Sequence, residues 1–330
     1  METGFTVKET IITLKRMKTA LFSASALYWG RLRENLIKLF HIFSGMIKFG
    51  VHLFLWAESF DLSALKLIKK AKDIGFDGVE IPMMDLDIID VEKTKKELKR
   101  HDVVGLGSMG LPLNLDIASN DEATRKRGIE HMKRSVEVTS ELGGDAINGV
   151  IYTAWGKITG KARTETEWRH SVESLKEICR YANKYGVTLG IEPVNRFETY
   201  FINTAADAVK LAKDVDEPSI KVHLDTFHMN IEEKNFYQPI KDTGSLLWHM
   251  HCCENDRGIA GTGHVDWDGV FQALSEINYD RWIVVESFTP DMEKIAASTA
   301  IWRKVAPSAD ALASEGLKFL KKMTNKYLGK

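Results

Sequence analysis

Four side chains able to bind a metal ion occur where four successive apolar runs end. They are Glu192 after TLGI, Asp225 at the end of IKVHLD, His251 at the end of LLWHMH, and Glu286 after RWIVV. Short apolar runs of this kind predict buried strands. Three carboxylates brought together without a cation would repel one another and raise their own pKa values. The pattern therefore predicts a divalent metal centre at the ends of neighbouring strands.

The donor set narrows the choice of metal. Three carboxylate oxygens and one imidazole suit Mn²⁺, Mg²⁺ or Co²⁺ better than a structural zinc ion. Two coordination positions would then stay open for substrate or water. His223 and His249 each precede a predicted ligand by two residues, so they face the same side of their strands. They could support the ligands from behind or be ordinary core histidines.

Strand and helix signals alternate eight times after residue 45. The predicted strands cover 47–55, 78–83, 103–109, 146–154, 188–194, 220–227, 246–254 and 281–288. The predicted helices cover 61–75, 91–101, 120–142, 164–185, 204–215, 233–243, 266–277 and most of the chain from 292. Eight such units predict a single (β/α)8 TIM barrel of the α/β class. Active sites of such barrels lie at the carboxyl ends of the strands, where the four candidate ligands fall on strands five to eight.

Residues 1–45 do not fit this alternation. We expect them to be an N-terminal extension outside the catalytic barrel, which spans residues 46–330. An over-long translation start or a loosely attached helical extension would explain them. The segment KRMK followed by TALFSASALYWG loosely resembles a signal peptide. However, no strand begins until Met46, and the apolar run is too short to span a bilayer.

Composition and charge limit the partners. The chain has 330 residues and a formal net charge of -1 without a basic block, so nothing indicates nucleic acid or a membrane surface as a partner. The three cysteines form no CxxC pair, which fits a reducing cytoplasm. No GxGxxG after a strand and no Walker lysine occur, so we expect no nucleotide cofactor. A cytoplasmic enzyme acting on a small molecule is the expectation.

Three motifs around the candidate ligands resemble the ketose 3-epimerases, the group of D-tagatose 3-epimerase and D-psicose (D-allulose) 3-epimerase within the xylose-isomerase-like barrels. They are NRFE at 195–198, LDTFHMNIEE at 224–233 and HxHxxExxR at 249–257. The resemblance runs from Met46 to the C-terminal helix and includes AW at 154–155 and IWR at 301–303. It implies an enzyme that acts on a ketose and forms a homodimer or homotetramer.

The resemblance also implies roles for individual residues. The implied metal ligands are Glu192, Asp225, His251 and Glu286, with Mn²⁺ usual and Co²⁺ or Mg²⁺ as alternatives. The implied substrate contacts are Glu198, His228 and Arg257, on loops beyond the ligands, and Trp155 as an aromatic wall of the sugar pocket.

The chain departs from the family pattern in the expected pocket wall. His52 stands where the family has an aromatic residue at the end of the first strand, and Phe60 replaces a tryptophan. ESF at 286–288 stands in place of Glu-Pro-Phe. These differences leave the preferred ketose open.

Epimerisation at C3 follows from such a site. A metal ion that polarises the C2 carbonyl of a ketose makes the C3 proton acidic. One carboxylate can then remove this proton to give a cis-enediolate, and a second carboxylate on the opposite face can return a proton. Glu192 and Glu286 lie on non-adjacent predicted strands, so they could face each other across a bound sugar.

Other functions remain possible for a barrel with these candidate ligands. A sugar-phosphate epimerase would need a phosphate site in the loops after strands seven and eight. An aldose–ketose isomerase or a dehydratase, such as hydroxypyruvate isomerase or inosose dehydratase, would share the metal ligands. A nuclease of the endonuclease IV kind conflicts with the neutral charge, and a non-catalytic sugar-binding barrel would not need two carboxylates at the metal.

Overall fold

The structure, a computed structural model, describes residues 47–329. Eight parallel strands close into one barrel, in which each strand pairs with its neighbour in the chain and β8 pairs with β1. The strands are β1 (Lys48–His52), β2 (Gly78–Pro82), β3 (Val104–Gly110), β4 (Ala146–Val150), β5 (Thr188–Ile191), β6 (Ile220–Asp225), β7 (Leu247–His251) and β8 (Trp282–Val285). The predicted (β/α)8 barrel is confirmed.

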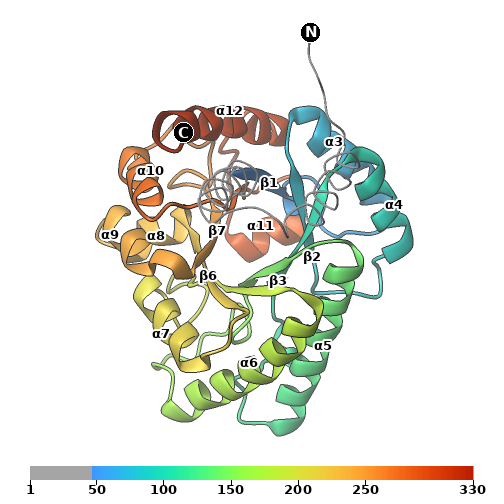
Figure 1. The fold of residues 1–330 in the computed structure, drawn as a ribbon, viewed down its shortest axis with the longest axis vertical. Coiled ribbons are helices and arrows are strands. Elements are labelled where there is room, and N and C mark those ends of the chain that lie inside the picture. The colour runs from blue at the N-terminus through green and yellow to red at the C-terminus, as the bar shows by residue number, and fades with distance from the viewer. Residues whose placement is uncertain (1–46, 330) are drawn as a thin grey trace, which may run out of the picture. The chain divides into compact units, whose positions relative to one another are not determined.

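Helices surround the barrel (Figure 1). They are α3 (Lys66–Ile74), α4 (Val91–His101), α5 (Glu122–Glu141), α6 (Glu165–Tyr185), α7 (Ala205–Val215), α8 (Thr226–Glu232), α9 (Tyr237–Thr243), α10 (Trp267–Glu276), α11 (Glu293–Thr299) and α12 (Ala309–Tyr327). Short 3-10 turns lie at Leu53–Leu55, Leu62–Leu65, Leu113–Leu115 and Gly244–Leu246. The predicted extension, residues 1–45, lies outside the described residues.

Side chains at the helix ends explain several boundaries. Thr164 and Glu167 form a reciprocal capping box at the start of α6, which satisfies two otherwise unpaired backbone N–H groups. Gly75 ends α3 with a φ of 108°, a left-handed conformation that glycine adopts without a steric penalty.

The sequence pattern misplaced one helix after β6. A single helix over 233–243 was expected, whereas α8 starts directly at Thr226 and α9 follows separately. The reason is the side chain of Asp225, which accepts the backbone N–H of Phe227 at 2.7 Å. Because a carboxylate at this position caps a helix, the chain turns from strand to helix without a loop. His228 is thereby placed in the first turn of α8.

The interior of the barrel changes from apolar to polar toward the carboxyl ends of its strands. Leu106, Ala146, Trp282 and Val284 form a buried apolar cluster. A Cβ atom on Gly78 would lie 2.6 Å from the ring of Trp282, so the glycine makes room for this large side chain. Alternation along β8 then directs Glu286 into the barrel two residues beyond Val284.

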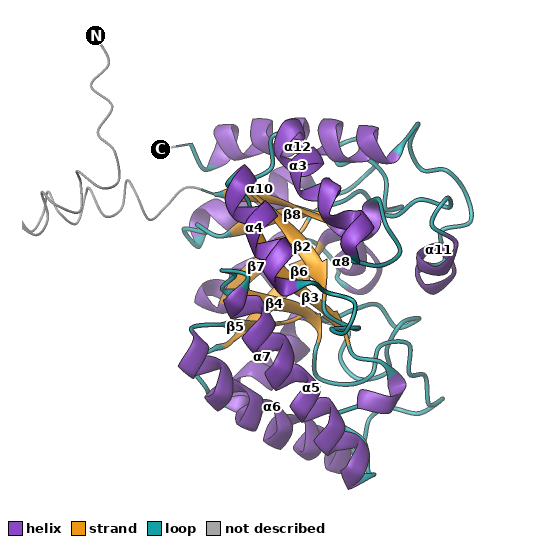
Figure 2. Ribbon diagram, turned by 90° about the vertical axis from the view of Figure 1, so that its right-hand side faces the viewer, coloured by secondary structure: helices purple, strands orange, loops and turns teal. Residues whose placement is uncertain are grey.

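The long loops and α11 lie beyond one end of the barrel (Figure 2, right-hand side). None of the helices within residues 47–329 combines the length and the apolar character that a membrane span requires.

Candidate active site

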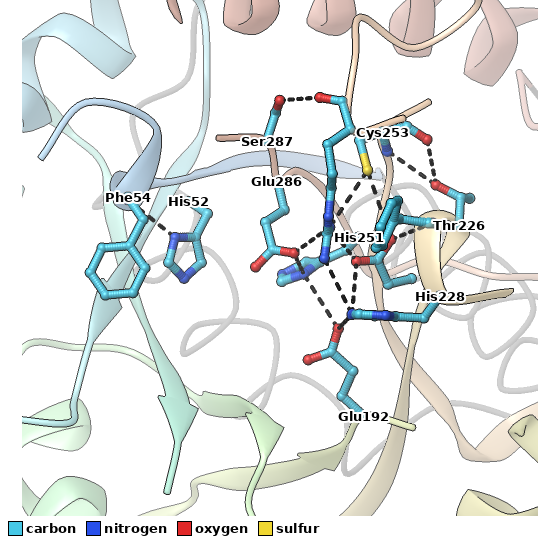
Figure 3. A network of polar contacts seen from close by, with 12 residues as sticks. His52, Phe54, Glu192, Thr226, His228, His251, Cys253, Glu286 and Ser287 are labelled. Atoms are coloured by element: carbon cyan, nitrogen blue, oxygen red, sulfur yellow. Dashed lines mark hydrogen bonds and ion pairs between the residues drawn. The ribbon is translucent and has the colours of Figure 1, made fainter. Parts of the chain in front are cut away.

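Four buried side chains converge at the carboxyl ends of β5 to β8. Asp225 and His251 are the last residues of β6 and β7, and Glu192 and Glu286 directly follow β5 and β8. One ligand atom from each of the four lies within 4.8 Å of the others. Figure 3 shows the carboxylates of Glu192 and Glu286 pointing toward the ring of His251. We call Glu192, Asp225, His251 and Glu286 the cage.

The cage has the donor atoms and spacing for a divalent cation. His251 Nδ1 lies 3.3 Å from Glu286 Oε2 and 3.9 Å from Glu192 Oε1. In octahedral coordination with bonds of about 2.1 Å, donors lie about 3.0 Å apart when adjacent and about 4.2 Å apart when opposite. Glu192 Oε1 and His251 Nδ1 are buried without a hydrogen-bond partner in the described residues. The residues therefore fit a metal ion bound by three oxygens and one nitrogen.

Burial and mutual repulsion set the protonation of the cage in the metal-free protein. Burial raises the pKa of Glu192 well above its ordinary value, and Glu286 and Asp225 add to the increase. Burial also raises the pKa of Asp225 to about 6. Burial opposes the ionisation of Glu286, but His251 and Arg257 hold its pKa well below the usual range. The surroundings thus move the pKa values of Glu192 and Glu286 in opposite directions.

Arg257 reaches between two cage residues. It lies on the loop after β7, as expected from the sequence, and its Nη1 lies 2.6 Å from both Asp225 Oδ2 and Glu286 Oε2. The backbone of Arg257 has a φ of 65°, and its carbonyl accepts the hydroxyl of Ser287. This turn directs the guanidinium back into the barrel, where it partly neutralises the cage.

His228 lies beside the cage on α8. Its Nδ1 accepts the backbone N–H of Asn195 at 3.1 Å, and its Nε2 lies 3.8 Å from carboxylate oxygens of Glu192 and Asp225. Burial and the nearby Arg257 lower the pKa of His228 well below its usual value, so the ring is neutral at pH 7. His228 can therefore offer a neutral hydrogen-bonding group to a bound molecule.

Trp155 and Glu198 form one side of the pocket together. The indole N–H of Trp155 donates to Glu198 Oε2 at 2.9 Å, and the side-chain amide of Asn195 donates to Glu198 Oε1 at 2.8 Å. Both Trp155 and Glu198 are only partly buried and line the cavity above the cage. A rigid aromatic face next to an oriented carboxylate suits the apolar and hydroxyl surfaces of a sugar.

His52 lines the same cavity from β1. Its Nε2 is 2.7 Å from Ser108 Oγ, and its Nδ1 accepts the backbone N–H of Phe54 at 3.2 Å. Both ring nitrogens are therefore engaged, and the ring is available for contact. The expectation that Phe60 forms part of this wall is wrong, because Phe60 is buried in the main core and Phe54 lines the cavity instead.

A carboxylate that the sequence reasoning passed over lies behind the cage. Glu80, in the middle of β2, is fully buried, and its Oε2 lies 2.7 Å from His251 Nε2. Its Oε1 lies 2.9 Å from His249 Nε2. The available signal was a single charged residue inside the apolar run GVEIP. His249 therefore lies close to a carboxylate, but its ring nitrogens, like those of His223, have no hydrogen-bond partner of good geometry in the described residues.

Similarity to known proteins identifies the family of the chain. The family model for the xylose isomerase-like TIM barrel matches residues 68–323. A ketose 3-epimerase from Arthrobacter globiformis is 35% identical over 281 residues, which cover 83% of this chain and 96% of that protein. The chain belongs to the ketose 3-epimerases. As a ketose 3-epimerase it is an isomerase of the carbohydrate epimerase class.

Two further ketose 3-epimerases extend the comparison. An L-ribulose 3-epimerase from Methylomonas sp. (strain DH-1) is 34% identical, over 84% of this chain and 98% of that protein. A crystal structure of D-allulose 3-epimerase from Methylomonas sp. in complex with D-allulose superposes with a TM-score of 0.81 at 32% identity, over 84% of this chain and 98% of that chain. The match covers nearly all of both relatives, so the whole catalytic domain is shared.

Proposed function

We propose that the protein epimerises free ketoses at C3 in a metal-dependent reaction, with substrates of the D-tagatose, D-psicose (or D-fructose) and L-ribulose type. The observation that carries the proposal is the cage itself, in which two glutamates from non-adjacent strands border one open cavity. The names of the similar proteins include two of these sugars, L-ribulose and D-allulose (D-psicose).

Glu192, Asp225, His251 and Glu286 would hold the cation, with Mn²⁺ the preferred ion and Co²⁺ or Mg²⁺ as alternatives. When bound, the ion supplies Lewis acidity that polarises the C2 carbonyl and makes the C3 proton acidic.

Glu192 and Glu286 would exchange protons with opposite faces of C3. Removal of the C3 proton by one carboxylate gives a cis-enediolate, and delivery by the other carboxyl group to the opposite face inverts the centre. In the metal-free protein the surroundings separate the pKa values of these two groups. Two carboxyl groups whose pKa values are pushed apart at one site suit an acid and base pair.

The remaining pocket residues would hold the sugar. Arg257, His228 and Glu198 can donate or accept hydrogen bonds with its oxygens, while Trp155 and His52 supply ring surfaces. These groups would fix the chain of the sugar so that C3 lies between the two glutamates. Orientation of this kind accounts for a large part of the rate in reactions of bound substrates.

The charge of the pocket favours a free sugar over a sugar phosphate. Among the described residues that line it, Arg257 is the one arginine or lysine, and it already contacts two carboxylates. The carboxylates of Glu192, Glu198 and Glu286 also line the pocket. A dianionic phosphate would meet repulsion there without a free cation to bind it.

Two further features belong to the proposal. The proposal includes a homodimer or homotetramer, as the resemblance to the ketose 3-epimerases implies, and the exposed side chains of Phe197 and Trp302 are available for a subunit interface. Cys179, Cys252 and Cys253 are unpaired and buried, which is consistent with the proposed cytoplasmic location.

The test is turnover by protein loaded with Mn²⁺. The protein is incubated with D-tagatose, D-psicose, D-fructose and L-ribulose, each with its phosphorylated counterpart in parallel, and the products are separated by chromatography. The proposal predicts C3 epimers from at least one free ketose and none after removal of the metal with a chelator. Turnover of the phosphorylated sugars alone would support a sugar-phosphate epimerase, an aldose product would support an aldose–ketose isomerase, and saturable binding without turnover would support a sugar-binding barrel.

A further inference from the structure

Glu80 is an unusual side chain for its place in the barrel. It lies in the middle of β2, has no exposed surface, and reaches across to side chains of β7. The next inward positions toward the base of the barrel are apolar. Removing a carboxylate from water is costly unless hydrogen bonds and opposite charge compensate for it. Its contacts must therefore explain why it is there.

The contacts of Glu80 determine how the ring of His251 is held. Glu80 Oε2 lies 2.7 Å from His251 Nε2, whereas His251 Nδ1 faces Glu286 and Glu192. A neutral imidazole carries one N–H and one lone pair. When Nε2 donates its proton to Glu80, the lone pair is on Nδ1, which is the nitrogen inside the cage.

We propose that Glu80 is the positioning residue of the metal centre, which fixes the tautomer and orientation of His251 and thereby sets the affinity for the cation. The inference rests on the proposed function, because it takes the cage as the metal centre. Carboxylates behind metal-binding histidines act in this way in other proteins. Glu80 itself is separated from the ion by the imidazole ring.

A carboxylate suits this position better than an amide of the same size. The Nε2 atoms of both His249 and His251 lie within 2.9 Å of Glu80 oxygens, one on each. A glutamine offers one accepting oxygen and turns an NH₂ group toward the other ring. Either His251 or His249 would then face a donor, and the ring that faces it must change its tautomer or rotate.

The experiment compares Glu80→Gln with the native protein in Mn²⁺ binding, measured without any ketose by the EPR signal of free Mn²⁺. We expect the dissociation constant for Mn²⁺ to be 10- to 100-fold larger in Glu80→Gln than in the native protein. Thermal unfolding of the metal-free proteins reports separately on the fold. Glu167→Gln is the matched control, since Glu167 is also buried and bonded to Thr164 and Tyr200 but contacts no cage residue in the structure. It should shift the melting temperature and leave Mn²⁺ affinity within about twofold.

A second readout separates positioning from general loosening of the barrel. With ¹⁵N-labelled histidine and Mg²⁺ bound, NMR should show His251 as the Nε2–H tautomer in the native protein and lose that signal in Glu80→Gln. Glu80→Asp, which keeps the charge but is one methylene shorter, should give an intermediate affinity. This variant also serves if Glu80→Gln does not fold.

Equal Mn²⁺ affinity in folded Glu80→Gln or Glu80→Asp and native protein would overturn the proposal, and so would an unchanged His251 tautomer in Glu80→Gln. The outcome is independent of turnover. If the native protein binds Mn²⁺ but converts no ketose, the proposed function fails and the role of Glu80 can still hold. If the native protein binds no divalent cation, the role of Glu80 fails as well.

Discussion

At the scale of single residues, the charge balance of the cage depends on Arg257. Its guanidinium contacts Asp225 and Glu286 while both are buried. A buried carboxylate that loses its cationic partner is strongly destabilising. Arg257 therefore affects the stability of the metal-free protein as well as the binding of a sugar.

Replacing Arg257 with alanine tests both effects. We expect the free energy of unfolding of the metal-free protein to fall by about 3–5 kcal/mol, and the loss to be smaller with Mn²⁺ bound because the ion also neutralises the carboxylates. Chemical denaturation with and without chelator measures the difference. Arg134→Ala is the control, since Arg134 pairs with Glu137 and Glu141 on the exposed side of α5 and should have little effect. Equal losses with and without metal would show that Arg257 does not balance the cage.

Individual residues also show how far the sequence could predict the site. The four cage residues were predictable because the end of a strand is visible in the hydrophobic pattern. The contact from Glu80 to His251 was not, because it crosses the barrel between residues 171 positions apart. The direction of the Arg257 side chain depends on a single left-handed backbone conformation. Because no glycine stands at that position, the sequence gives no sign of this conformation.

At the scale of elements, the junction of β6 and α8 joins metal binding to helix formation. Asp225 is a cage residue and also caps α8 through the N–H of Phe227. The hydrophobic period revealed the strand and predicted a loop after it. The capping role was hidden, because Asp225 had already been explained as the end of a strand.

Two substitutions separate the roles of Asp225. Asparagine keeps the capping oxygen but removes the charge, whereas alanine removes both. Both variants should bind Mn²⁺ much more weakly than the native protein. In urea denaturation of the metal-free proteins, Asp225→Ala should be about 1 kcal/mol less stable than Asp225→Asn.

The same pair at Asp121, which caps α5 through Thr124, should follow the same order of stability without any effect on Mn²⁺ binding. If Asp225→Ala is as stable as Asp225→Asn, the cap does not determine where α8 begins.

At the scale of the whole molecule, metal binding should stabilise the fold in a pH-dependent way. A ligand at about 100 times its dissociation constant adds about 2.7 kcal/mol, which corresponds to about 4–5 °C in melting temperature for a domain of this size. In the metal-free protein, burial raises the pKa of Asp225 to about 6 and that of Glu192 well above its usual value. Although burial opposes it, Glu80 and Glu286 raise the pKa of His251. The ion binds to the deprotonated forms of these groups, so it displaces whatever protons they carry.

The displacement of protons determines how the stabilisation by Mn²⁺ changes with pH. Mn²⁺ competes with protons at low pH, so the increase in melting temperature should be larger at pH 7.5 than at pH 5.5. The raised pKa of Asp225 has the opposite consequence without metal: the folded state binds more protons, so this group lowers the free energy of unfolding as pH rises from about 4 to about 6. Scanning calorimetry with Mn²⁺ and with chelator measures the metal-induced shift and the pH dependence of the metal-free protein. A metal-induced shift in melting temperature that is the same at pH 5.5 and pH 7.5 would contradict the assignment of the cage.

We expect the N-terminal extension, residues 1–45, to be unnecessary for the fold and the activity. The described barrel begins with β1 at Lys48 and closes through the pairing of β1 with β8. A protein shortened to start at Met46 should therefore keep the melting temperature and the epimerase activity of the full chain. Loss of both in the shortened protein would show that residues 1–45 contribute to the folded domain.

The central claim, proton exchange at C3 by two carboxylates, can be tested in deuterated water. The Mn²⁺-loaded protein converts a ketose, and NMR locates the deuterium in the recovered sugars. Glu192→Gln and Glu286→Gln keep an oxygen that can bind the metal but cannot act as bases, and each is used after its metal content has been confirmed.

The native protein should place deuterium at C3 of the epimer. Each variant should lose net epimerisation by about 10²–10⁴-fold, and each should retain C3 exchange only in the epimer that the remaining glutamate can deprotonate. Deuterium at C1 or C4, or near-normal epimerisation by either metal-loaded variant, would contradict the two-carboxylate mechanism at C3.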